Sequence, residues 1–189
     1  CSSDLAAPPN SPTPAQLRAT LAAAFLGWMF DGMEMGLFPL IARPALLAMQ
    51  TAHGATASDA FVGLWMGRVT AAFLLGAALG GVVFGWLGDR FGRVKAMAWS
   101  ILCYSLFTGL IYFASEPWHL GAFRFIAALG MGGEWALGVA LVMEVWPEKH
   151  RPLMAGVIGA AANVGYAVIG FVGLSFKVTD RKSTRLNSS

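Results

Sequence analysis

Apolar residues gather in five long stretches of the chain, and short polar segments separate them. The stretches cover residues 20–41, 63–87, 96–114, 118–142 and 154–176. Each has roughly the length, about 20 residues, that an α-helix needs to cross a bilayer. Helices are expected because lipid offers no other partner for backbone polar groups. Alternating stretches of about 10 residues, typical of β-barrel strands, do not occur. The pattern predicts an all-α membrane protein with five transmembrane helices.

The two ends of the chain lack this pattern. Residues 1–16 are rich in Pro, Ser and Ala, so we expect a disordered leader. We expect the helix bundle within residues 17–177 and a non-native tail at 178–189. The last ten residues, DRKSTRLNSS, match the translation of a common sequencing-adapter string, so the native chain is expected to end near Thr179. The alternative is an ordinary basic tail. Cys1 stands where Met would begin a chain, which suggests a fragment edge.

Composition supports a lipid environment. The chain is 57% hydrophobic and 12% charged, with a mean hydropathy of +0.62. Soluble domains carry about 25% charged residues, so too little polar surface remains here to face water. The two cysteines, Cys1 and Cys103, form neither a disulfide framework nor a metal-ligand spacing. We therefore expect no cofactor, no metal and no nucleic-acid partner.

Basic residues predict the orientation, because they are enriched in short loops on the cytoplasmic side. With the N-terminus inside, the cytoplasmic segments contain Arg18, Arg90, Arg93, Lys95, Lys149 and Arg151. The outer loops before the end of the fifth stretch contain Arg43. We expect an integral protein of the cell (plasma or inner) membrane with a cytoplasmic N-terminus.

The loop after the second stretch combines glycines, an acid and several cations. It reads GWLGDRFGRVK over residues 85–95. Gly88 and Gly92 permit a tight turn, and the cations hold the loop inside and can pair with Asp89. A simple positive-inside loop would explain the cations, but neither the acid nor the paired glycines.

This loop resembles the signature of the major facilitator superfamily. The matching positions are Gly85, Leu87, Gly88, Asp89, Arg90, Gly92, Arg93 and Lys95. The resemblance implies a fold of twelve helices in two six-helix halves, of which this chain would supply five helices of the N-terminal half. It also implies that the loop is a conformational latch whose partner is the missing C-terminal half. We expect the fragment alone to be inactive.

A second charged cluster follows the fourth stretch, at residues 144–151. It resembles the family's E-x-x-P-x-x-x-R element through Glu144, Pro147 and Arg151, with Pro152 in place of the usual Gly. Glu144 and Arg151 are expected to join Asp89 and Arg93 in one charge network. A solvated surface loop is the alternative.

Two acids lie inside the first stretch. Asp31 is about 16 Å along the helix, near the bilayer centre, and Glu34 follows on the same face. The run from Phe30 to Glu34 resembles the D-G-x-D element of aromatic-acid and sialic-acid proton symporters. Intramembrane acids are functional candidates, and burial favours proton binding by a carboxylate. A permanent pair with a cation from another helix is the alternative.

The fourth stretch carries Arg124 and Glu134, which lie within about 80° of each other around the helix. The segment around them resembles the family's glycine-rich fourth-span motif, and GGEW resembles metabolite:proton symporters. In that family the first and fourth spans line the central cavity, so the four charges are expected to converge there. Arg124 would hold a substrate carboxylate or pair permanently with an acid.

The leading interpretation is a secondary active transporter that moves a small organic solute, a carboxylate or sugar-like metabolite, together with protons. A passive facilitator of the same fold is the alternative. A membrane-embedded enzyme needs a nucleophile–base set or metal ligands at depth. The histidines His53, His119 and His150 lie at loops or span ends and do not supply them. We therefore expect no enzyme.

Overall fold

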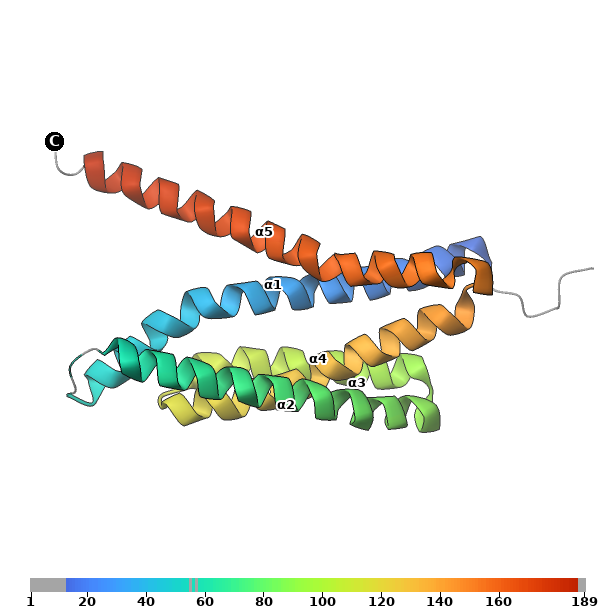
Figure 1. Ribbon diagram of the computed structural model, residues 1–189, viewed down its shortest axis with the longest axis horizontal. Coiled ribbons are helices and arrows are strands. Elements are labelled where there is room, and N and C mark those ends of the chain that lie inside the picture. Colours follow the sequence, from blue (N-terminus) through green and yellow to red (C-terminus); the bar gives the residue numbers. More distant parts are fainter. Residues whose placement is uncertain (1–12, 55, 57, 187–189) are drawn as a thin grey trace, which may run out of the picture.

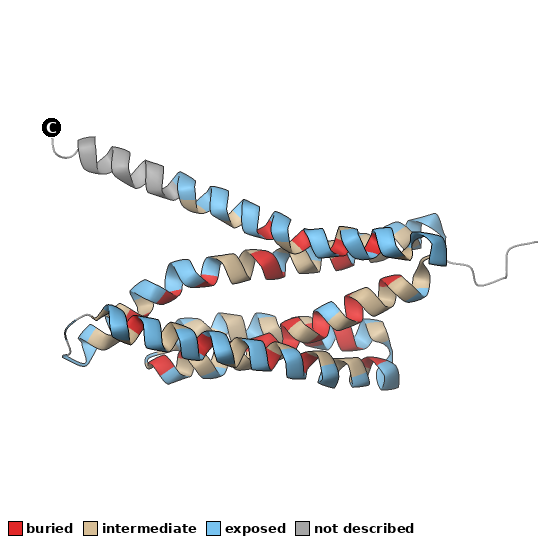
Figure 2. Cartoon of the chain, in the orientation of Figure 1, coloured by how far each residue is buried: buried red, intermediate tan, exposed pale blue. Residues whose placement is uncertain are grey.

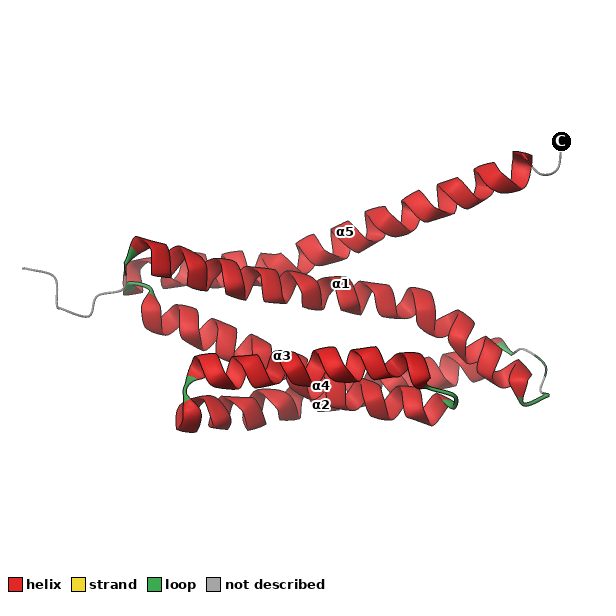
Figure 3. Cartoon of the chain, turned by 180° about the vertical axis from the view of Figure 1, so that it is seen from behind, coloured by secondary structure: helices red, strands yellow, loops and turns green. Residues whose placement is uncertain are grey.

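The computed structural model describes residues 13–186 apart from 55 and 57, and for 176–186 it describes the backbone alone. Five long helices make up the fold: α1 (Pro14–Ala52), α2 (Asp59–Phe91), α3 (Arg93–Leu110), α4 (Pro117–Val145) and α5 (Arg151–Leu186). Two 3₁₀ turns, Ile111–Phe113 and Glu148–His150, precede α4 and α5. No strand occurs in the described ranges (Figure 3). The predicted all-α fold is confirmed.

The helices extend beyond the apolar stretches. Thr13 caps α1 in a capping box with Gln16, and Pro14 occupies the first helical position. Residues 13–16 therefore belong to the cap and first turn of α1, whereas the sequence placed them in the leader. The rest of that expected leader, residues 1–12, lies outside the described residues. The side chains of the expected tail also lie outside them, so its origin stays a prediction.

All five helices are long and apolar enough to cross a membrane. Their outer faces carry many exposed residues (Figure 2), among them the large apolar Leu75, Leu79 and Leu102. Such continuous apolar surface would be unfavourable in water and is expected against lipid. The protein is therefore an integral membrane protein.

The helices form two groups. Helix α4 packs against α2 and α3, α1 packs against α5, and a smaller α1–α4 contact joins the groups (Figure 1). Small residues permit the closest approaches: a Cβ at Gly132 would fall on the Ala77 carbonyl of α2, and one at Gly165 on the Met29 carbonyl of α1. Helix α5 diverges from the bundle toward its C-terminal end (Figure 1).

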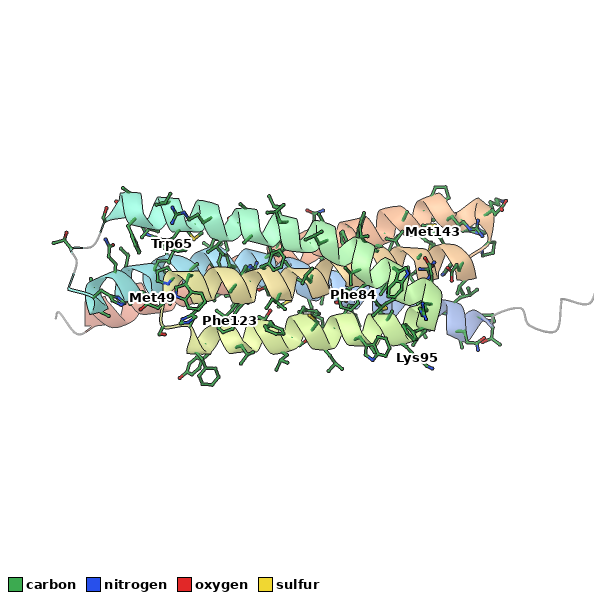
Figure 4. All side chains as sticks on the ribbon, turned by 90° about the horizontal axis from the view of Figure 1, so that it is seen from below. Met49, Trp65, Phe84, Lys95, Phe123 and Met143 are labelled. Carbon is green, nitrogen blue, oxygen red and sulfur yellow. The ribbon has the colours of Figure 1, made fainter. Side chains whose placement is uncertain are left out.

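The bundle has two ends that differ in chemistry. One end, here called the motif end, carries the α2–α3 loop with the signature of residues 85–95, the α4–α5 connection and the start of α1. The opposite end carries the α1–α2 and α3–α4 connections. Figure 4 shows Phe84, Lys95 and Met143 toward the motif end and Met49, Trp65 and Phe123 toward the opposite end.

Candidate functional site

A cavity of about 600 Å³ is lined by residues of α1, α2, α4 and α5. Its wall is mostly apolar. Trp28 and Trp135 stand side by side in it, with ring centroids 5.4 Å apart and planes tilted by 36°. Among the described residues, Asp31 is the one ionisable side chain in the wall. The cavity thus offers aromatic surface around a single carboxyl group.

Asp31 reaches this position because α1 and α5 approach closely. A Cβ at the next residue, Gly32, would fall on the Ala162 backbone of α5. Asp31 is 6% exposed, and its Oδ1 finds no hydrogen-bond partner within the described part of the chain. A buried polar atom without a partner is costly, so it marks a place where a proton, water or solute can bind.

Arg124 and Glu34 form an ion pair between α4 and α1. Arg124 is 3% exposed. Its guanidinium carbon also lies 4.2 Å from the ring centroid of Phe38 and 4.6 Å from that of Phe73, distances typical of cation–π contacts. Phe73 in turn lines the cavity. Arg124, the one buried cation among the described residues, is thus held by an acid and two rings, and Phe73 contacts both Arg124 and the cavity.

Glu134 lies elsewhere, at the interface of α4 and α1. It is 1% exposed, and neither carboxyl oxygen has a hydrogen-bond partner among the described residues. Its carboxyl group occupies the space where a side chain at Gly27 would project. No polar group on the described helices donates a hydrogen bond to this carboxyl group.

Of the four charges expected to line one cavity, Asp31 lines it, while the other three lie close by along the α1–α4 contact. Helices α1 and α4 are antiparallel neighbours, and the four charged residues form a row along the contact between them. Glu134 beside Gly27 is nearest the motif end, Asp31 follows in the cavity wall, and the Glu34–Arg124 pair is nearest the opposite end. Sequence spacing placed the four charged residues on two helices, but it did not predict which of them would meet.

The charged residues at the motif end have a clear geometry. Arg93 binds Asp89 at 2.7 Å and Glu144 at 3.0 Å, which ties the end of α2 and the start of α3 to the end of α4. A Cβ at Gly88 would fall on Leu137 and crowd Arg93, and Gly92 has φ 96°, a conformation that favours glycine. The glycines thus allow the turn that presents Arg93.

Three other motif residues lie outside this cluster. Arg151 binds Glu148 at 3.6 Å and donates to the Trp146 carbonyl at 3.1 Å, so the expected network with Asp89 does not include it. Arg90 lies over Trp86, 5.6 Å from its ring centroid. Gly85 has open space where a Cβ would project.

The opposite end contains a pair that the sequence did not reveal. His53 Nδ1 contacts the Met49 carbonyl at 2.7 Å, and Nε2 contacts Glu116 at 2.8 Å. The backbone hydrogen bond and the nearby carboxylate raise the pKa of His53 above its ordinary value. The partners are 63 positions apart in the chain and left no local signal, because only the fold brings the two loops together.

The chain matches the family model of the Major Facilitator Superfamily over residues 20–176. It belongs to the major facilitator superfamily. This agrees with the signature at the motif end, the five apolar helices and the buried charges. No three His, Cys, Asp or Glu side chains of the described ranges lie together as a metal site.

Its curated relatives are transporters, not enzymes. The chain is 34% identical to the inner membrane metabolite transport protein YgcS of Escherichia coli over 58% of this chain and 25% of the relative. It is 33% identical to a gentisate transporter of Corynebacterium glutamicum, over 82% of this chain and 33% of the relative. It is 33% identical to the niacin transporter NiaP of Acinetobacter baylyi, over 78% and 31%.

The chain spans about a third or less of the length of these relatives. No solved structure gives a significant match.

Proposed function

We propose that this chain is part of a secondary active transporter that carries a small organic carboxylate together with protons by alternating access. The observation that carries the proposal is the charge balance inside the bundle. Within the described helices, the α1–α4 region holds three carboxyl groups, of Asp31, Glu34 and Glu134, but one guanidinium, that of Arg124, which pairs with Glu34. Carboxyl groups without a cation are costly in lipid, so a purely structural protein would not be expected to keep them. A proton-coupled transporter requires such groups to bind and release protons.

The aromatic wall supports a solute with a flat apolar part. Trp28 and Trp135 can stack against a ring. Gentisate and niacin, which two relatives are named for, are aromatic carboxylic acids. A sugar would need many hydrogen-bonding groups, which this wall does not provide. An aromatic or similarly apolar carboxylate therefore fits better.

The Arg124–Glu34 pair suggests how solute and proton are coupled. A solute carboxylate that passes Phe73 would compete with Glu34 for the guanidinium. Glu34, displaced from its cation, would then take up a proton, because an unpaired carboxylate is unfavourable at this depth. Solute binding and proton binding would thus favour each other.

The motif end supports a latch. Arg93 joins the ends of α2, α3 and α4 through two ion pairs, and such a junction can open when these helix ends separate. We place this end and the N-terminus in the cytoplasm because the basic residues gather there. We place the protein in the cell membrane. The remaining helices and the second half, which the family fold implies, would complete the pathway.

The decisive experiment measures uptake of radiolabelled gentisate or nicotinate into cells that express the whole transporter containing this chain. We expect accumulation that a protonophore abolishes and that Asp31→Asn removes, because this acid lines the cavity. A passive facilitator would equilibrate the solute without accumulating it. Accumulation that an uncoupler leaves unchanged would exclude proton coupling.

A further inference from the structure

The Glu134 side chain of α4 packs against Gly27 of α1. Gly27 and Asp31 are four residues apart, so they lie on one face of α1. A Cβ at Gly27 would overlap Glu134 Oε1 and lie 3.1 Å from its carboxyl carbon. The carboxyl group of Glu134 therefore fills the space that the absent side chain of residue 27 leaves, one helical turn from the Asp31 in the cavity wall.

Glu134 has nothing to stabilise a negative charge. It is 1% exposed and neither oxygen has a hydrogen-bond partner among the described residues. Burying an ionised carboxylate without a partner costs far more than burying the neutral acid. Burial without a partner therefore favours the neutral carboxylic acid over the carboxylate in this conformation.

The neighbouring helices do not change this conclusion. Toward the middle of the bundle, helix α1 contributes Asp31 and Glu34, and α3 contributes the phenol of Tyr104, none of which is a cation. The cations of α1 and α3 lie toward the helix ends: Arg18, Arg43, Arg93 and Lys95. Arg93 already binds Asp89 and Glu144. On α4 itself the cation is Arg124, which already binds Glu34. The charged residues of α2 lie toward its ends, and the described side chains of α5 include one cation, Arg151, at its first residue.

We propose that Glu134 carries a coupled proton in this conformation, and that Gly27 is the positioning residue that makes room for its carboxyl group beside Asp31. The inference rests on the proposed proton-coupled transport. Asp31 faces the cavity and can exchange protons with water there, whereas Glu134 is shielded. When α1 and α4 separate, water reaches Glu134 and stabilises the carboxylate, so the proton leaves.

The first test detects the proton directly. Infrared spectra of the 189-residue chain in lipid show the C=O stretch of protonated carboxylic acids apart from the bands of carboxylates. We expect a protonated band at neutral pH that Glu134→Gln removes. Asp31→Asn and Glu34→Gln serve as comparison variants. Identical protonated bands in the original protein and Glu134→Gln would overturn the proposal.

The second test probes Gly27 through its size. Gly27→Ala should displace the carboxyl group into a more hydrated position, weaken the protonated band and reduce proton-driven uptake by the whole transporter about tenfold. Gly138→Ala is the matched control, because it lies one turn beyond Glu134 on α4 and its Cβ would sit 3.7 Å from the nearest atom. We expect this control to leave band and uptake essentially unchanged.

A rescue separates positioning from general damage. In Gly27→Ala combined with Glu134→Asp, the acid is one methylene shorter and no longer meets the new methyl group. We expect the double variant to recover the protonated band and part of the uptake relative to Gly27→Ala alone. A double variant no better than the single one would contradict the positioning role.

The outcomes distinguish this inference from the proposed function. Proton-dependent accumulation that persists unchanged in Glu134→Gln would overturn the role of Glu134 while leaving proton-coupled transport intact. Uptake that an uncoupler does not affect would overturn the proposed function, and the coupling role of Glu134 with it. Loss of coupling together with loss of the infrared band in Glu134→Gln would support both.

Discussion

At the scale of single residues, the bundle interior separates three carboxyl groups that look equivalent in the sequence. Glu34 has a cation, Asp31 has a cavity, and Glu134 has neither. The same chemical group is therefore suited to three tasks: holding Arg124, meeting the solute and storing a proton. The environment sets the difference, because in lipid the cost of a charge depends on what it can pair with.

The Arg124–Glu34 pair should respond asymmetrically to mutation. Glu34→Gln leaves a buried guanidinium without its acid, so we expect the free energy of unfolding to fall by about 3 kcal/mol. The double variant Glu34→Gln with Arg124→Met removes both charges and should regain most of this loss. Reversible unfolding in mixed micelles measures both. Equal losses in the single and double variants would argue against a buried pair.

At the scale of helices, single glycines set how closely the helices approach. Gly80 and Gly81 are neighbours on α2, yet they differ in surroundings. A Cβ at Gly80 would fall on the Leu129 backbone of α4, whereas one at Gly81 would lie 3.7 Å from the nearest atom. In α5, Gly165 is in close contact and Gly173 in ordinary contact, whereas a Cβ at Gly156, Gly159 or Gly170 would meet no atom within 4 Å.

The two adjacent glycines provide a controlled test of helix packing. Gly80→Ala should push α2 from α4 and destabilise the bundle by about 1–3 kcal/mol. Gly81→Ala should be neutral or slightly stabilising, because alanine is the better helix former. Thermal unfolding in detergent compares them. Similar melting temperatures for the two variants would contradict the close α2–α4 contact.

The connection between the α1–α2 and α3–α4 loops should depend on pH. The raised pKa of His53 means that the folded protein binds this proton more tightly than the unfolded chain. The resulting stabilisation is complete below the ordinary pKa of 6.5 and is lost as the pH rises through the raised value. We expect the melting temperature to decline over that range, and to decline less in His53→Gln. An identical pH profile in the variant would exclude this pair as the cause.

At the scale of the whole molecule, the cavity is bounded by both helix groups, while Arg93 joins helix ends at the motif end. Asp89 and Glu144 have side chains that are more than half exposed. Ion pairs of this kind contribute about 0–1 kcal/mol to stability. A latch with this energy can open at little cost, which suits a protein that alternates between two conformations.

The latch therefore predicts a change in function without a change in stability. Arg93→Ala should shift the melting temperature very little, because its ion pairs are exposed. It should lower the transport rate of the whole protein strongly and change the accessibility of cysteines placed near the motif end. Arg90→Ala, outside the ion-pair cluster, is the matched control. A normal transport rate in Arg93→Ala would contradict the proposed latch role of Arg93.

The sequence by itself determined the five helices, their membrane location and the family. Twenty apolar residues in lipid leave the backbone one satisfactory structure, and the glycine–charge signature is local in the chain. It also singled out Asp31, Glu34, Arg124 and Glu134 as charges within the membrane, because a charge at that depth is costly and calls for a partner or a function. These conclusions needed only local pattern and the physics of the bilayer.

The tertiary structure alone decided which of these groups meet. That Arg124 selects Glu34 rather than Asp31, that Glu134 fits against Gly27, and that His53 reaches Glu116 all depend on how far each helix is rotated about its axis. Backbone contacts at Gly32, Gly132 and Gly165 fix those rotations, and their partners lie far away in the chain. A different rotation of α1 or α4 would place a different carboxyl group beside the Arg124 guanidinium, so local pattern could not predict the pairing.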